Sequence, residues 1–405
     1  MSAHGEVRGI ELWELWAPGI AAALVSLDAG GLLACSLAGA RFGPWMALAV
    51  PPLILAGVLV HELAARLGSV TGKGTSDLIR ERFGVRWTSA ILGALWLVSI
   101  GTMLAQFVGV AAAGEVFGIP RFVGVPIAAA IIWLVPLRAD RTWLERGLLA
   151  ACLAFVVYLL AVVVAGFAAV VPRPGPQPGW IGYPGMGLAL VGALLAPWTQ
   201  FYLQGAMVDR QIQARDLGLA RRGVIAGAVV LGLVAMAIIL TCAAGLFVPG
   251  VRLGAAADAA LALAPLAGPF AAPLFAVVLL IASCHAALVL PVVTAAALCD
   301  GLGFASGTEE SFAEAPVFYV AYAATIVVGA ALALLPWPRL LPVMIGVEVA
   351  NGVLVPGMLV VLALLASRRR LLGAHAIGTR LGAAVWGIAG FVALLALVAL
   401  IATVS

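Results

Sequence analysis

Long apolar stretches recur along the chain at a length that matches the thickness of a lipid bilayer. A hydrocarbon core about 30 Å thick is crossed by about 20 apolar residues in an α-helix. Eleven stretches of that kind lie at residues 12–36, 44–65, 88–113, 120–137, 143–171, 185–208, 223–248, 269–299, 315–336, 340–366 and 379–403. The pattern predicts an all-α polytopic membrane protein, with a single transmembrane domain over residues 1–405.

Two of these stretches are interrupted at matching places. The first span contains LDAGG at Leu27–Gly31, and the sixth contains APWTQ at Ala196–Gln200. Glycine pairs and a proline inside a span leave backbone groups that lipid cannot satisfy, so such breaks are tolerated where they line a cavity. Broken helices at the start of two five-helix blocks predict a 5+5 inverted repeat, with a binding site near the middle of the bilayer. The alternative is an ordinary kink at Pro197 and a helix-packing surface at Gly30 and Gly31.

The breaks divide the chain into two predicted repeats and one further helix. Repeat one is expected over about residues 12–171, repeat two over about 185–366, and the extra helix over about 379–403. No cleavage pattern occurs in the first dozen residues, so the first span is expected to be a retained helix and not a signal peptide.

Composition excludes most other classes of protein. The 405 residues are 64% hydrophobic and 10% charged, with a mean hydropathy of +1.17, whereas soluble domains have roughly 45–50% apolar and about 25% charged residues. A soluble, disordered or disulfide-stapled domain is therefore excluded, and a net charge of +4 spread over short loops does not suit a nucleic-acid binder. The five cysteines form no CxxC motif and are expected to pack as small apolar residues.

The distribution of basic residues predicts the orientation. With the N-terminus inside, seventeen Arg and Lys residues fall in cytoplasmic segments and five on the opposite side. Cytoplasmic loops retain positive charge, so we expect the N-terminus inside and the C-terminus outside. The use of 21 Arg and one Lys suggests a bacterium with high GC content, so the expected location is the inner (cell) membrane. The loop with Asp300, Glu309, Glu310 and Glu314 has no basic residue, but acidic residues count little towards topology.

Asp28 is the most informative polar residue in the apolar spans, because it adjoins the first break. A buried carboxylate costs several kcal/mol unless it meets a cation, water or a partner, and no Arg or Lys lies deep in any span. Its counter-ion is either a transported cation or a proton. Glu348 and Asn351 share one face of the tenth span. A functional role is favoured for Glu348, whereas Asn351 is equally suited to an interhelical hydrogen bond. The other buried polar residues are Gln106, Thr199, Gln200 and Gln204.

Two segments resemble a known family. The run LDAGGLLACSLAGARFG at 27–43 and the run ELAARLGSVTGKGTSDLIRERFG at 62–84 resemble the first helix and the second-to-third loop of the NRAMP divalent-metal transporters. That family usually has DPGN in the first helix and Met-Pro-His in the sixth. The resemblance implies a LeuT-type fold with eleven spans. This chain departs from the family at Gly31, where the asparagine ligand is lost, and at Ala196, where the methionine is lost.

These departures change the expected chemistry of the site. A thioether favours soft transition metals, and its loss leaves a carboxylate, carbonyl groups and water, the oxygen ligands that suit Mg²⁺. The DAGG sequence and the alanine in helix six are similar to the NRAMP-related magnesium transporters, a branch regarded as transporting Mg²⁺ and also Mn²⁺. The ion is then a substrate, and no cofactor or obligate protein partner is expected besides the metal ion and the bilayer.

The resemblance also implies which residues surround the ion. Asp28 is the expected direct or water-mediated ligand, and the carbonyls near Val25 and Ala193 are expected to face the ion. Glu348 falls about where the family often has a glutamine, so it would add a second negative charge. With Thr199 and Gln200 as supporting contacts, the predicted metal site is Asp28, Gly31, Val25, Ala193, Ala196, Thr199, Gln200, Glu348 and Asn351.

Proton coupling is not expected. The usual members of the family have histidines along helix six that can handle protons near neutral pH, and this chain has Trp198 and Gln204 at about those places. Of its four histidines only His285 is expected well inside a span, as a packing or hydrogen-bonding residue. The sequence therefore favours uptake that is not proton-coupled. The alternatives are a proton-coupled Mn²⁺/Fe²⁺ transporter and an amino-acid transporter of the same fold, whose substrate carboxylate Asp28 would repel.

Two motifs that suggest an enzyme fail on closer inspection. HELAA at His61–Ala65 lacks the second histidine of a zinc-protease helix, and GSVTGKG at Gly68–Gly74 lacks the Ser or Thr of a phosphate-binding loop. The chain is not expected to be an enzyme. Glu62 and Arg66, four residues apart, are interpreted as a surface ion pair at the cytoplasmic end of span two.

Overall fold

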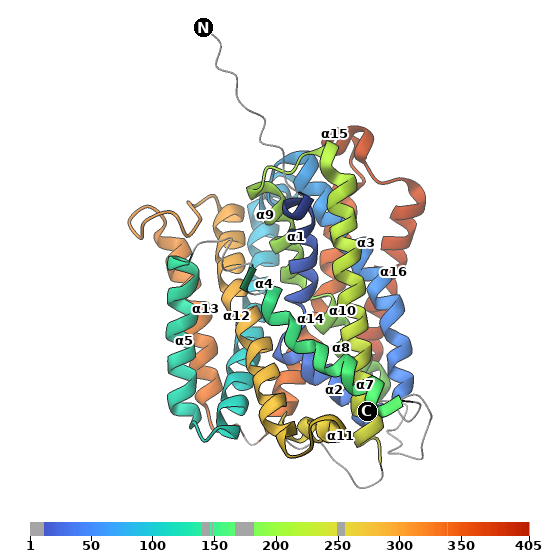
Figure 1. Cartoon of the computed structure of the whole chain (residues 1–405). Helices are drawn as coiled ribbons and strands as arrows, with labels where there is room; N and C mark the ends of the chain where they lie inside the picture. The colour runs from blue at the N-terminus through green and yellow to red at the C-terminus, as the bar shows by residue number, and fades with distance from the viewer. Residues whose placement is uncertain are drawn as a thin grey trace.

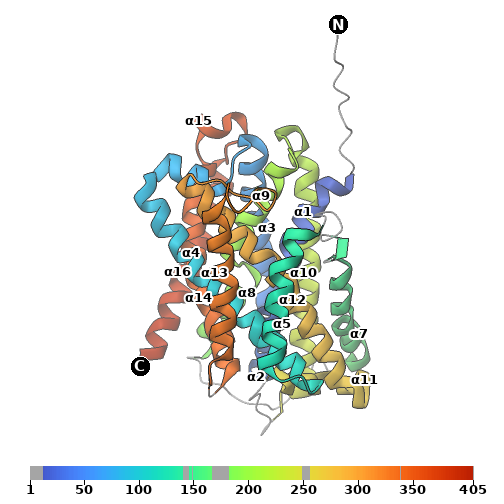
Figure 2. The same cartoon turned by 90° about the vertical axis from the view of Figure 1, so that its left-hand side faces the viewer.

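The computed structural model describes residues 12–139, 146–147, 149–166, 182–248, 256–337 and 339–404. They form a bundle of long helices with roughly a common axis (Figure 1). The beginning of α1 and the short helix α15 lie at one end of this bundle, and α11 and the end of α2 lie at the other (Figures 1 and 2).

The α-helices and 3₁₀ helices follow the predicted spans closely. In the first half they are α1 (Leu12–Leu24), α2 (Ala29–Phe42), η1 (Pro44–Ala49), α3 (Val50–Thr71), α4 (Thr75–Val116), α5 (Arg121–Arg138), η2 (Cys152–Phe155) and α7 (Val156–Ala165). In the second half they are α8 (Gly182–Leu194), α9 (Pro197–Asp209), η4 (Ala214–Asp216), α10 (Leu217–Leu246), η5 (Ala256–Leu263), α11 (Ala264–Ala267), η6 (Gly268–Phe270), α12 (Ala271–Leu302), α13 (Pro316–Leu334), α14 (Leu340–Ala366), α15 (Arg369–Leu372), η7 (Gly373–His375) and α16 (Thr379–Val404).

The predicted all-α membrane fold is confirmed. Within the described residues, nine helical spans are long and apolar enough to cross a membrane, and the bent pair α1–α2 makes a tenth. A shorter apolar helix, Leu149–Ala165, lies in the fifth predicted span, and the remainder of that span falls outside the described ranges. α4 begins earlier than predicted, at Thr75, and it is kinked at Gly84, where a φ of 76° favours glycine.

The broken sixth span lies at the centre of the bundle. In an 18-residue stretch of α8 and α9, 89% of the residues are buried, against 17% in α5 and 22% in α16. α5 and α16 accordingly stand at the outside of the bundle (Figures 1 and 2). The two breaks are therefore enclosed by other helices, which is where unpaired backbone groups can be accommodated.

Glycines let the central helices approach backbone to backbone. A Cβ at Gly192 of α8 would lie 1.8 Å from the carbonyl oxygen of Glu348, and one at Gly352 of α14 would lie 2.4 Å from that of Leu188. Small residues are the usual means of close helix packing in a membrane, because apolar side chains gain nothing by leaving lipid. The contact sets the height of Glu348 relative to the second break.

Candidate metal site at the two helix breaks

The first break separates α1 from α2, and the two helices are bent by 57°. Asp28 is the N-cap of α2, with an extended backbone (φ −84°, ψ −175°), and its Oδ1 accepts a hydrogen bond from the Gly31 N–H at 2.7 Å. Aspartate is favoured at this position because its carboxylate satisfies a free N–H at the helix start. The N-terminal end of a helix also favours negative charge. The sequence thus places an anion at the break.

Gln106 of α4 contacts the same break with both ends of its amide. Its Nε2 donates to Asp28 Oδ2 at 2.7 Å, and its Oε1 accepts from the Ala29 N–H at 3.1 Å. In a continuous helix the Ala29 N–H would donate to the carbonyl oxygen four residues earlier, that of Val25. The Val25 carbonyl has therefore lost its helical donor.

The second break frees a carbonyl by a different route. Leu195 and Ala196 separate α8 from α9, and Ala196 has φ −44° and ψ 128°. The residue four positions after Ala193 is Pro197, which has no N–H, so the Ala193 carbonyl has no helical donor. A Cβ built on Gly31 would lie 3.6 Å from the Ala193 side chain. The two breaks are therefore in contact, as the predicted site requires.

Glu348 brings a second carboxylate to the first break. A Cβ on Gly30 would lie 2.0 Å from Glu348 Oε1 and 3.3 Å from Asp28 Oδ1, so these two oxygen atoms are no further apart than the sum of those distances. Asp28 is 6% exposed and Glu348 is 1% exposed, and Glu348 Oε1 has no hydrogen-bond partner. No ion pair found among the described residues includes either carboxylate. Two buried acids without a basic neighbour favour a cation between them.

Three other predicted residues support the helices. Asn351 donates to Thr102 Oγ1 of α4 at 3.1 Å. This is the interhelical hydrogen bond that the sequence offered as the alternative to a role of Asn351 in metal binding. Thr199 Oγ1 donates to the Ala196 carbonyl at 2.8 Å. The Gln200 amide also lies against the carbonyls of this break: its Nε2 is 3.5 Å from the Leu195 carbonyl oxygen, and with its oxygen and nitrogen exchanged it donates to the carbonyls of Ala196 and Pro197. Thr199 and Gln200 therefore stabilise the second break, where Ala196 provides no thioether.

The ligand set is small. Across the described ranges, no group of three or more His, Cys, Asp or Glu side chains is placed to hold a metal ion. The groups available at the breaks are two carboxylates and two freed carbonyls, so an ion bound there would complete its shell with water. Oxygen-only coordination with retained water is typical of hard dications.

His61 lies deeper than predicted. It is 2% exposed in α3, and its Nε2 lies 3.2 Å from Thr199 Oγ1. Because the Thr199 hydroxyl donates to Ala196, the hydrogen of the His61 contact must be on the imidazole. The prediction that only His285 would lie well inside a span is wrong, since α3 continues to Thr71 and His61 is not near its end. His285 is also buried, with Nδ1 3.5 Å from Cys152 Sγ, a contact that no sequence motif indicated.

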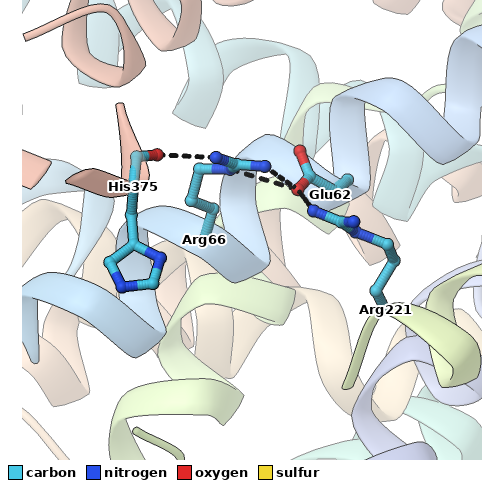
Figure 3. Close-up of polar contacts among 4 residues, drawn as sticks. All are labelled: Glu62, Arg66, Arg221 and His375. Atoms are coloured by element: carbon cyan, nitrogen blue, oxygen red, sulfur yellow. Dashed lines mark hydrogen bonds and ion pairs between the residues drawn. The ribbon is translucent and has the colours of Figure 1, made fainter. Parts of the chain in front are cut away.

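The predicted ion pair of Glu62 and Arg66 is present, but the prediction that it lies at the surface is wrong. Glu62 is 4% exposed, and its Oε1 accepts from Arg66 and from Arg221 of α10, each at 2.5 Å. Arg66 also donates to the carbonyl of His375 at 2.6 Å (Figure 3). The start of α10 covers this part of α3, and the network joins α3 to α10 and η7.

Gln204, the third polar residue of α9, has a role away from the breaks. It is fully buried, its Nε2 donates to the Lys73 carbonyl at 2.8 Å, and its Oε1 accepts from the Thr75 hydroxyl. The Gln204 side chain therefore fixes the connection between α3 and α4 against α9.

In a comparison with known proteins, one family profile matches nearly the whole chain and a curated relative matches a large part of it. Residues 19–402 match the profile of the family described as "Natural resistance-associated macrophage protein-like", or Nramp. The "Divalent metal cation transporter MntH" of Deinococcus radiodurans is 32% identical over 289 residues, which are 65% of this chain and 63% of that protein.

Solved structures share the fold. A mutant of the Eremococcus coleocola manganese transporter superposes with a TM-score of 0.76 at 19% identity, over 99% of this chain and 88% of the other. MHP1, a transporter of the nucleobase-cation-symport-1 family, gives a TM-score of 0.60 at 15% identity, over 96% of this chain and 90% of the other. At these identities the likeness concerns the fold alone.

Proposed function

This chain belongs to the Nramp family, and on that premise we propose that it is a secondary transporter for divalent metal cations. The proposed substrates are Mg²⁺ and also Mn²⁺, taken up as partly hydrated ions. The proposal is consistent with the name of its relative from D. radiodurans, a divalent metal cation transporter.

One observation carries the proposal: Asp28 and Glu348 adjoin each other at the first break, without a basic partner among the described residues. A dication provides the charge that two buried carboxylates lack. The freed carbonyls of Val25 and Ala193 supply further oxygen ligands, and Ala196 supplies no sulfur. Such a site favours hard ions over soft ones. An amino-acid substrate fits less well, because both acids would repel its carboxylate.

We infer that uptake is driven by the membrane potential and does not carry protons. An inside-negative potential contributes about 2.3 kcal/mol per charge per 100 mV, or about 4.6 kcal/mol for a dication. α9 offers Trp198 and Gln204 where a histidine relay would be needed, and Gln204 is engaged with the Lys73 carbonyl. The orientation proposed for this uptake has the N-terminus in the cytoplasm of a bacterium and the C-terminus outside.

One observation favours a second candidate, proton-coupled transport of Mn²⁺. His61 is buried and contacts Thr199, which in turn holds the Ala196 carbonyl at the second break. A histidine that close to the site is the usual kind of proton carrier near neutral pH.

Proteoliposomes separate the two candidates. The purified protein is reconstituted with a pH dye inside and an inside-negative potential, and Mg²⁺ or Mn²⁺ is added outside. Saturable metal entry without acidification of the lumen supports the first candidate. Metal-dependent acidification that is lost in His61→Gln supports the second, and acidification that is lost in Glu348→Gln makes Glu348 the carrier. Absence of metal entry would refute both.

A further inference from the structure

We infer that Gln106 is a positioning residue for the transported ion, because its single amide prepares two of the ligands at the first break. This inference rests on the proposed function. It concerns a residue of α4 that is fully buried and lies 78 positions along the chain from Asp28.

The donor end of the amide fixes the carboxylate. Asp28 Oδ1 is held by the Gly31 N–H and Oδ2 by Gln106 Nε2, each at 2.7 Å. One contact comes from α2 itself and the other from α4, so the carboxylate plane is held at both oxygens. Each oxygen keeps a second lone pair with which to bind a cation. A carboxylate fixed in this way loses less rotamer freedom when the ion binds.

The acceptor end of the amide frees the carbonyl. Gln106 Oε1 takes the Ala29 N–H, the only backbone donor placed by helical spacing to close onto the Val25 carbonyl. Without an acceptor from α4, that N–H would be a buried unpaired donor, which favours closure of the helix over the break. The Gln106 side chain therefore keeps the Val25 carbonyl open towards the ion.

The packing of α4 makes both contacts possible. One turn after Gln106, a Cβ on Gly109 would lie 2.7 Å from the Ala29 side chain and 2.3 Å from Ser283 Oγ. One turn before it, Thr102 accepts the hydrogen bond from Asn351 of α14, the helix that carries Glu348. α4 thus presents one polar face to the first break and to α14, and Gln106 is the member of that face that reaches the ligands.

The inference is tested by the kinetics of Mg²⁺ uptake in proteoliposomes. Gln106→Met keeps the length of the side chain and removes both hydrogen bonds. Gln106→Asn keeps the amide but shortens it, so that it cannot reach both partners. We expect the KM for Mg²⁺ to rise at least about tenfold in Gln106→Met, with kcat within about twofold of wild type, and to rise less in Gln106→Asn. The KM for Mn²⁺ should rise in parallel, because both prepared ligands bind either ion.

The matched control is Ser99→Ala. Ser99 is buried on the same helix and accepts a hydrogen bond from Thr294 at 3.1 Å, away from the break. A merely structural role for Gln106 would lower kcat or the yield of folded protein and leave KM near that of the control. A folded Gln106 variant whose KM for Mg²⁺ equals that of wild type overturns the inference. If Gln106→Met does not fold, the KM of Gln106→Asn is the test. If wild type itself shows no saturable metal uptake, the proposed function fails instead.

Discussion

The two helix breaks reach the same backbone result by different means. At the second break Pro197 has no N–H, so the Ala193 carbonyl lacks its helical donor whichever helices surround it. At the first break the Ala29 N–H exists but is taken by Gln106 of another helix. The first break also carries the charge of Asp28, whereas the second is held by its own Thr199 and Gln200. The first break should therefore depend on distant helices, and the second should depend on local sequence.

Removal of the charge at the first break should have the largest effect. Asparagine caps a helix about as well as aspartate, so Asp28→Asn tests the charge while keeping the start of α2. Loss of one member of a buried charge pair costs about 3–5 kcal/mol, and transport of Mg²⁺ should fall to near background with normal membrane insertion. Thr199→Val, at the second break, should retain measurable transport. Saturable uptake by Asp28→Asn at the wild-type rate would remove Asp28 from the site.

Removal of the second carboxylate should have a smaller effect. Glu348 reaches the first break from α14, and its Oε1 is not held by any hydrogen bond in the described part of the chain. With this oxygen unpaired, Glu348 is less preorganised than Asp28, both of whose carboxylate oxygens accept a hydrogen bond. Glu348→Gln should weaken Mg²⁺ binding roughly tenfold when measured by calorimetry. An unchanged Kd would mean that Glu348 does not bind the ion.

Restoring a backbone N–H at position 197 tests whether the missing proline donor matters at the second break. Pro197→Ala supplies an N–H that can close onto the Ala193 carbonyl, so the KM for Mg²⁺ should rise several-fold, by about the value of one hydrogen bond. Pro126→Ala in the exposed part of α5 is the control and should leave the KM unchanged. If both proline variants behave like wild type, the Ala193 carbonyl contributes nothing to ion binding.

Selectivity should respond to a softer ligand at the second break. Ala196→Met adds a thioether, and we expect Mn²⁺ or Cd²⁺ binding to strengthen several-fold relative to Mg²⁺. Gly31→Asn is harder to interpret, because a Cβ at this position would lie 3.0 Å from the Ser26 carbonyl oxygen and could shift the backbone. Calorimetry of Ala196→Met with each ion measures the preference. The same preference as in wild type would show that selectivity does not depend on ligand softness.

Much of the architecture could be predicted from the sequence. The length of the apolar stretches indicates membrane-spanning helices, and glycine or proline in the middle of a stretch indicates where a helix breaks. The all-α fold and the membership of the Nramp family, a transporter and not an enzyme family, are confirmed by the structure and the comparisons. Asp28 could be selected because a carboxylate within an apolar span is costly. The repeat boundaries, the orientation and the roles of the ligands stay predictions.

The errors and omissions concern contacts between distant segments. Gln106 was visible as a lone buried amide, but its contact with Asp28 depends on how α4 packs against α2. The burial of Glu62 could not be predicted, because its second arginine, Arg221, lies 159 positions away. Hydropathy alone ends span two at residue 65 and so predicts His61 near a helix end, whereas α3 continues to Thr71. The local pattern of apolar residues predicts where the helices lie. The partners of a buried polar side chain depend on how those helices pack against each other.

Direct uptake of Mg²⁺ and Mn²⁺ into proteoliposomes, with the internal pH recorded at the same time, tests the central claim that Asp28 and Glu348 form a site for hard dications. The account predicts that both ions enter saturably under an inside-negative potential, that the lumen does not acidify, and that Asp28→Asn abolishes entry. Wild-type vesicles that take up neither ion, or Asp28→Asn vesicles that take up both as well as wild type, would contradict it.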